Sequence, residues 1–264
     1  MSNLIYDGTV KFEFLEKGHK YVVSLAVGKD WTTPTPVVGI TTITSIIAKD
    51  ALISWSAKLA AYYMRDNWKE GCNLAALAES AKTAHMDEKR KAAGTGTVGH
   101  KLIEALLLGK EVVMPEKDGL KEAIANIRKQ HEKFEADFKP ETIHVEQPMY
   151  SKTHNFAGTD DRFCVIDGKR VVVDYKTSNR SYYNPDGIYG SNFAQIGGQI
   201  LLIEEQLGEE VDDGWIVNYA KDSEDYKLRS LSEMGLTTTD AKLYFLHCLN
   251  LYNLNKTFDW KVSR

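Results

Sequence analysis

Two aspartates and a lysine are spaced so that a predicted hairpin brings them together. Asp167-Gly168 stands between the apolar runs 163–166 and 171–173, and this dipeptide favours a type I′ turn because both central residues need positive φ. Counting outward from that turn places Asp161 directly opposite Asp174. Opposed carboxylates, about 5 Å apart at Cβ, repel each other unless something neutralises them. The spacing therefore predicts a divalent-cation site.

The alternation of side chains along a strand decides which neighbours share that face. Side chains two apart point to the same side, so Lys176 accompanies Asp174, while Asp160 and Tyr175 point to the other side. Carboxylate oxygens suit Mg²⁺ or Mn²⁺, and an adjacent ammonium suits a phosphate held by that cation. A bulge at the turn would shift the register and put Asp160 on the metal face instead.

This segment resembles the PD-(D/E)XK nuclease superfamily, in its RecB-like, phage-type exonuclease branch. The match is Gly158-Thr159-x-Asp161 followed by Asp174-x-Lys176-Thr177. The resemblance implies an α/β fold, in which a small mixed β-sheet flanked by helices forms a restriction-endonuclease-like core with a helical N-terminal elaboration. We expect residues 1–94 to be N-terminal strands and helices packed on the core, and residues 95–264 to form the core with its C-terminal helix.

Two further parts of the resemblance precede the hairpin. Gly-Thr-x-x-His, ending at His100, resembles the first motif of RecB-like nucleases, which implies that His100 is an added metal ligand; from the residues alone a core or cap histidine fits as well. Glu104 lies one helical turn later on the same face. Three roles fit it: contact with the metal through water, support of the site, or simple exposure to solvent. Glu146 occupies the place of a family glutamate, which implies a supporting role, with an exposed strand position as the alternative.

Another part of the resemblance follows the hairpin. Gln195 matches the glutamine that comes after the lysine motif, whereas the tyrosine expected four residues later is replaced by Gln199 on the same helical face. The resemblance implies that His100, Asp161 and Asp174 bind the cation, together with the backbone carbonyl of Tyr175. It also implies that Lys176 positions the attacking water and offsets phosphoryl charge, and that Gln195 orients Lys176 or the substrate.

Two segments are candidates for contact with DNA. The loop 177–190 contains Arg180, Tyr182 and Tyr183, and such aromatic rings can stack on unpaired bases for about 1–3 kcal/mol per base. Packing of these tyrosines on their own domain explains them equally well. Lys89 and Arg90 belong to a mixed-sign cluster on a predicted helix, which is more often a solvated face than a phosphate site.

Composition narrows the cofactors and the compartment. The 264 residues carry a formal charge of −4, which disfavours nonspecific coating of nucleic acid but permits a local basic groove. The three cysteines are widely separated, so we expect a reducing compartment and no iron–sulfur cluster. No signal peptide, membrane-spanning run or phosphate-binding loop is visible. We therefore expect a cytoplasmic protein of a bacterial or phage-infected cell, with no membrane contact and no nucleotide cofactor.

Hydrophobic periodicity predicts the elements that position these residues. Strands are expected at 10–14, 21–25, 142–150, 215–219 and 226–228, and helices at 51–67, 74–93, 100–109, 120–138, 193–206 and 239–254. The glycines at 94, 96 and 99 predict a break between two of the helices. The first two strands are expected to form a hairpin with a structural role.

The resemblance as a whole implies a Mg²⁺- or Mn²⁺-dependent exonuclease for linear, end-bearing DNA, single- or double-stranded. Recombination, repair or phage DNA processing would be its setting, and a single-strand annealing or recombination protein its partner. One alternative is a structure- or site-specific endonuclease of the same superfamily. The other is a catalytically silent module for DNA binding or assembly.

Overall fold

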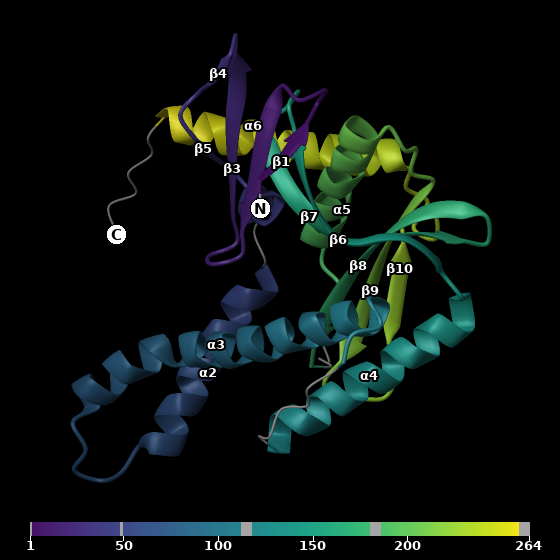
Figure 1. Cartoon of the computed structure of the whole chain (residues 1–264). Coiled ribbons are helices and arrows are strands. Elements are labelled where there is room, and N and C mark those ends of the chain that lie inside the picture. Colours follow the sequence, from purple (N-terminus) through teal and green to yellow (C-terminus); the bar gives the residue numbers. More distant parts are fainter. Residues whose placement is uncertain (1, 48–49, 112–117, 180–185, 259–264) are drawn as a thin grey trace.

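The computed structural model describes residues 2–47, 50–111, 118–179 and 186–258, which form a mixed α/β structure with two sheets (Figure 1). Each sheet has five strands. Within these ranges, none of the helices combines the length and the apolar character that crossing a bilayer would require.

The first sheet is built from the N-terminal residues. Its strands are β1 (Ser2–Ile5), β2 (Val10–Leu15), β3 (Lys20–Val27), β4 (Asp30–Trp31) and β5 (Thr35–Val37), in the order β1-β2-β3-β4 with β5 also paired to β3. The predicted hairpin is confirmed as β2 and β3. One face of this strand pair is apolar, and its burial is favourable because it removes apolar surface from water. The buried residues on this face are Val10, Phe12, Tyr21 and Val23, which pack against Tyr150 and Ala157 of the second sheet.

The second sheet is mixed, as expected. Its strands are β6 (Glu141–Ser151), β7 (Phe156–Ile166), β8 (Lys169–Ser178), β9 (Asp213–Ala220) and β10 (Lys227–Ser230), in the order β10-β9-β8-β7-β6. Only the pair β8 and β9 is parallel. Parallel neighbours need a crossover, and α5 (Gly190–Leu202) with the π-helical turn η1 (Ile203–Leu207) forms the helical part of this connection.

The central hairpin has the predicted register. Asp167 and Gly168 have φ values of 50° and 77°, the two positive values that a type I′ turn needs. Pairing runs from Ile166 with Lys169 to Arg162 with Val173. The bulge that would have exchanged Asp160 for Asp161 is therefore absent from this turn.

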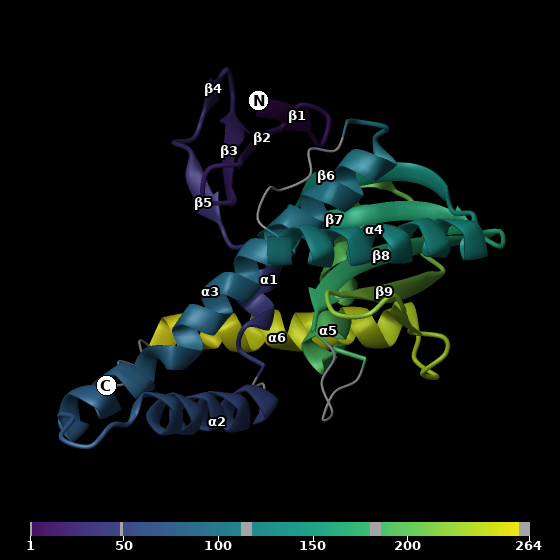
Figure 2. The same cartoon turned by 90° about the horizontal axis from the view of Figure 1, so that it is seen from below.

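Helices cover both faces of the second sheet. They are α1 (Ile40–Thr44), α2 (Asp50–Asn67), α3 (Leu74–Leu107), α4 (Asp118–Phe138) and α6 (Thr238–Phe258), besides α5. The C-terminal half of α3 and α4 lie on one face, α5 and α6 on the other, while α2 and the first half of α3 project from the body (Figures 1 and 2).

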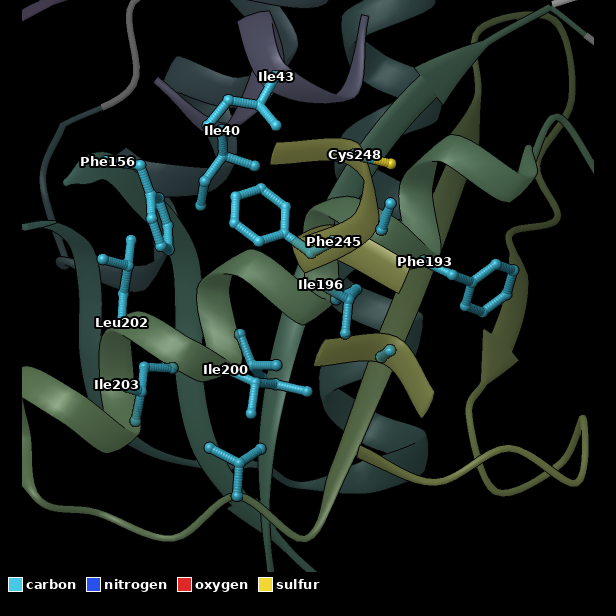
Figure 3. Close-up of a cluster of buried hydrophobic side chains, with 14 of the residues drawn as sticks. Ile40, Ile43, Phe156, Phe193, Ile196, Ile200, Leu202, Ile203, Phe245 and Cys248 are labelled. Carbon is cyan, nitrogen blue, oxygen red and sulfur yellow. The ribbon is translucent and has the colours of Figure 1, made fainter. Parts of the chain in front are cut away.

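The core on the α5 and α6 side is tightly packed. Figure 3 shows Phe245 of α6 among Ile40, Phe156 and Ile200. A Cβ atom at Gly197 would lie 1.9 Å from the backbone oxygen of Ala241, so only glycine lets α5 approach α6 this closely. The second sheet is thereby held firmly beneath its helices.

The predicted break in α3 is wrong. Residues 74–107 form one continuous helix, and residue 94, the expected boundary between two regions, lies inside it. Helical glycines cost roughly 1 kcal/mol each relative to alanine, but at Gly99 the absence of a side chain permits close packing. A Cβ there would lie 3.1 Å from Ile127 Cδ1 and 3.2 Å from Thr177 Cγ2. The helix ends as predicted, with Gly109 at a φ of 62°.

Candidate metal and active site

Three carboxylates lie in a row across β6, β7 and β8. Val145 pairs with Arg162 and Gln147 with Asp160, which sets Glu146 opposite Asp161. The hairpin register continued by one residue sets Asp161 opposite Asp174. The backbone N–H of Tyr175 donates to Asp161 Oδ2 at 2.6 Å, which ties this side chain to β8. Such a row of like charges is unfavourable unless a cation neutralises it.

His100 of α3 reaches the same place. Its Nδ1 lies 3.8 Å from Asp161 Oδ2, and one ligand atom from each of His100, Glu146 and Asp161 lies within 4.8 Å of the others. Glu146 has a φ of 47°, a conformation that is rare outside glycine and that concentrates at functional sites. Two carboxylates and an imidazole fit the donor preferences of Mn²⁺, and the carboxylates fit Mg²⁺.

The electrostatics of Glu146 also fit a cation. Burial, followed by the negative charges of Asp161, Glu104, Asp160 and Asp174, raises the pKa of Glu146 to about 8. A divalent cation beside this carboxylate would reverse the shift, because it favours the ionised form. His100, Glu146 and Asp161 are therefore a donor set that could hold a divalent cation.

A second group of polar side chains surrounds Asp174. This carboxylate is fully buried, and its Oδ2 lies 2.5 Å from Lys176 Nζ. Gln195 joins both: its Nε2 donates to Asp174 Oδ1 at 2.9 Å, and its Oε1 accepts from Lys176 Nζ at 3.2 Å. Gln199 donates to Asp174 Oδ1 from one turn later, at 3.4 Å. The pKa of Asp174 is raised because burial outweighs the attraction of Lys176.

Two acidic residues, Asp174 and Glu146, have different surroundings in the structure from those that the sequence predicts. Asp174 was expected beside Asp161 on the cation, and here its oxygens are engaged by Lys176, Gln195 and Gln199. Glu146 was expected only to support the site, and here it lies among the candidate donors. Its alignment with Asp161 depends on a register shift of β6 between Thr142 and His144, which no local pattern of residues predicts.

The predicted alternation of side chains holds on both strands. Tyr175 is buried on the α4 side in a cluster with Val173 and Val217. Asp160 is also buried and lies 3.1 Å from His144, Oδ2 to Nδ1, and burial raises the pKa of Asp160. Only Asp161 of the two adjacent aspartates borders the cleft described next.

The candidate donors and Lys176 open into one cleft of about 980 Å³ between the two sheets and α3. His100, Glu146, Asp161, Lys176 and Gln195 line it, as does Glu104, whose Oε1 lies 3.8 Å from Lys110 Nζ. The opposite wall comes from the first sheet and consists of Phe14, Glu16, His19 and Tyr21. Hydrophobic periodicity predicts this hairpin of the first sheet but not its place beside the site. That place depends on a contact between two sheets whose residues are more than 100 positions apart in the sequence.

Of the five residues expected to contact DNA, the structure describes Lys89 and Arg90. Arg180, Tyr182 and Tyr183 fall outside the described residues. Lys89 and Arg90 are exposed on the projecting half of α3, where Arg90 is paired with Asp87 at 2.5 Å. At 1.5 Å per residue, Arg90 lies about 15 Å along the helix from His100. These two basic residues therefore do not border the cleft.

Comparison with known proteins does not place this chain in a family. No protein-family model matches it, and no curated protein matches it. Among solved structures, the crystal structure of SSO0001 is similar over 52% of this chain and 62% of that chain, with 16% identity and a TM-score of 0.31. The match thus spans less than two thirds of SSO0001, and a likeness this weak carries no argument about fold or function.

Proposed function

We propose that this protein is a metal-dependent nuclease of the PD-(D/E)XK superfamily that hydrolyses phosphodiester bonds in DNA. One observation supports this most directly: His100, Glu146 and Asp161, which fit a cation, share a cleft with Lys176, whose ammonium is paired with the buried carboxylate of Asp174. A fixed ammonium beside a cation site is the charge pattern that a phosphodiester needs as negative charge grows on its oxygens. The second sheet, with α3 to α6, would be the restriction-endonuclease-like core.

His100, Glu146 and Asp161 would hold Mg²⁺ or Mn²⁺, and Asp174 and the backbone carbonyl of Tyr175 remain proposed ligands. When bound, the cation would polarise a phosphoryl oxygen and lower the pKa of a coordinated water. Lys176 is part of this chain's own contribution, because its ammonium can donate to a phosphoryl oxygen or orient the attacking water. Gln195, through its contacts with Lys176 and Asp174, acts as a positioning residue.

The preference for DNA ends rests on the resemblance to RecB-like and phage-type exonucleases. The decisive experiment compares end-labelled linear DNA with closed circular DNA in Mg²⁺ or Mn²⁺, and then with chelator. We expect loss of linear DNA only, dependent on the cation. Cleavage of the circle would favour a structure- or site-specific endonuclease, and failure to hydrolyse either DNA would favour a catalytically silent binding or assembly module. A single-strand annealing or recombination protein stays the proposed partner in DNA processing in the cytoplasm.

The role of Lys176 has its own test. We expect Lys176→Ala to lower the turnover of linear DNA by about 10²-fold or more, because the variant loses a preorganised charge at the reacting phosphate. Circular dichroism and melting should report a retained fold. Lys169→Ala is the matched control, since Lys169 is on the same strand but is exposed and outside the cleft. Wild-type turnover in Lys176→Ala would remove this residue from the mechanism.

A further inference from the structure

The wall of the cleft that faces the candidate donors carries a cluster of three rings. Phe14 and Tyr21 are stacked, with centroids 5.2 Å apart and planes at 29°. The ring of His19 meets both of them edge-on, at 4.9 Å from Phe14 and 5.5 Å from Tyr21. Tyr21 is buried, Phe14 is half-buried and His19 is exposed, so the cluster presents an aromatic surface to the cleft.

His19 is held in place from several sides. Its Nε2 is 3.0 Å from the hydroxyl of Tyr21, which in turn is 2.9 Å from Thr159 Oγ1. Its φ is 48°, a value that non-glycine residues rarely adopt and keep only where the surroundings fix them. Partial burial lowers the pKa of His19, which favours a neutral ring at pH 7. The side chain is thus a preoriented flat surface rather than a cation for phosphate.

The charges of the cleft give a bound strand one orientation. Its basic lining residues, Lys101 and Lys176, belong to α3 and β8, whereas Glu16 belongs to the wall with the rings. Glu104, Glu146 and Asp161 line that side as well, so phosphates are attracted to it once a cation offsets these carboxylates, whereas Glu16 repels them from the wall with the rings. Thr159, which anchors Tyr21, lies two residues from Asp161, roughly 6–7 Å along β7. That span lets one nucleotide have its phosphate at the donors and its base at the rings.

We propose that the ring cluster of Phe14, His19 and Tyr21 is a stacking site for an unpaired nucleobase, so that the cleft takes single-stranded or frayed DNA. The DNA ligand rests on the proposed function, but the site itself rests on the rings and their position. Stacking on protein rings needs a base whose face is free, which the interior of a duplex does not offer. The first sheet would then select the strand whose phosphate reaches Lys176.

The test measures binding in chelator, so that hydrolysis plays no part. The probe is a single-stranded oligonucleotide with 2-aminopurine as its terminal base, at the 5′ end or at the 3′ end, compared with a blunt duplex labelled at the same position. The main variant is His19→Asn, because asparagine tolerates positive φ and keeps a polar side chain but has no ring. Phe14→Leu is the second variant, and His247→Asn on the exposed surface of α6 is the matched control.

We expect the wild type and the control to bind the single strand and to quench 2-aminopurine. His19→Asn should bind about 5- to 150-fold more weakly, the range expected for one lost stacking contact, with less quenching; Phe14→Leu should act in the same direction. Unchanged affinity and quenching in both variants, tighter binding of the duplex, or no binding of the strand by the wild type would overturn the inference. Cation-dependent hydrolysis is assayed separately, so stacking without cleavage would reject only the nuclease proposal.

Discussion

At the scale of single residues, Glu146 differs most from its prediction: the sequence predicts a supporting residue, and the structure places it among the candidate metal donors. Burial, followed by the negative charges of neighbouring carboxylates, raises the pKa of this side chain to about 8, well above that of a free surface glutamate. The shift follows from burial beside other carboxylates, so this residue should govern the affinity of the site for its cation.

Substitution of Glu146 tests that role. We expect Glu146→Gln to raise the Mn²⁺ or Mg²⁺ concentration for half-maximal binding by about tenfold or more, since changes around metal ligands typically cost 10–100-fold. Titration calorimetry with Mn²⁺ measures this without DNA. Glu141→Gln, on the exposed start of the same strand, should bind as the wild type does. Equal affinities in the two variants would show that Glu146 is not a ligand.

At the scale of elements, the continuity of α3 has a direct consequence for stability. Gly94 is exposed inside this helix, and nothing lies within 4 Å of a Cβ placed there. Gly94→Ala should therefore stabilise the protein by about 0.5–1 kcal/mol through helix propensity. Gly197→Ala should instead destabilise it by several kcal/mol, because a backbone oxygen of α6 occupies the space. Urea unfolding of both variants measures the difference, and destabilisation by Gly94→Ala would restore the predicted break.

The packing of α4 on the sheet predicts a dependence on pH. Burial lowers the pKa of His131 from 6.5 to about 4, while its Nδ1 lies 3.0 Å from the Tyr219 hydroxyl. The unfolded chain binds more protons than the folded protein between these values, so the contribution of His131 to stability is lost as pH falls from about 6.5 to 4. Over that window the wild type should lose on the order of 3 kcal/mol more than His131→Gln. Urea unfolding at pH 7, 5.5 and 4.5 measures the free energy of unfolding of both proteins. The same dependence of this free energy on pH in the two proteins would contradict the prediction.

At the scale of the whole molecule, Glu205 joins the two sheets. Its carboxylate accepts from Tyr6 in the turn between β1 and β2 at 3.0 Å, from Ser151 at 2.5 Å and from the backbone N–H of Thr153 at 2.9 Å. The cleft exists only while the sheets stay in contact, so this carboxylate helps to maintain the wall that carries His19.

Loss of Glu205 should loosen the first sheet alone. We expect Glu205→Ala to cost on the order of 2 kcal/mol, from lost charge-assisted hydrogen bonds, and to speed amide exchange in β2 and β3 more than in β7 and β8. Hydrogen exchange read by mass spectrometry separates these strands. Glu209→Ala, on a half-exposed side chain of the second sheet's connecting loop, is the control. Uniform acceleration over all four strands would mean that the sheets unfold as one unit.

The sequence by itself determined the local geometry of the central hairpin. A two-residue turn fixes the register of its strands, and alternation fixes their faces, so the places of Asp161, Asp174 and Lys176 followed from counting. The helix end near Gly109 followed in the same way, because positive φ is a local property.

Only the tertiary structure decided what meets across the cleft. The alignment of Glu146 with Asp161 depends on an irregular register in β6, and the continuous helix α3 places Gly99 close to Ile127 and Thr177, where a Cβ would be crowded. The facing of His19 toward the donors depends on contact between two sheets far apart in sequence. Such contacts depend on how apolar surfaces from distant parts of the chain are buried and fit together, so a local pattern of residues does not predict them.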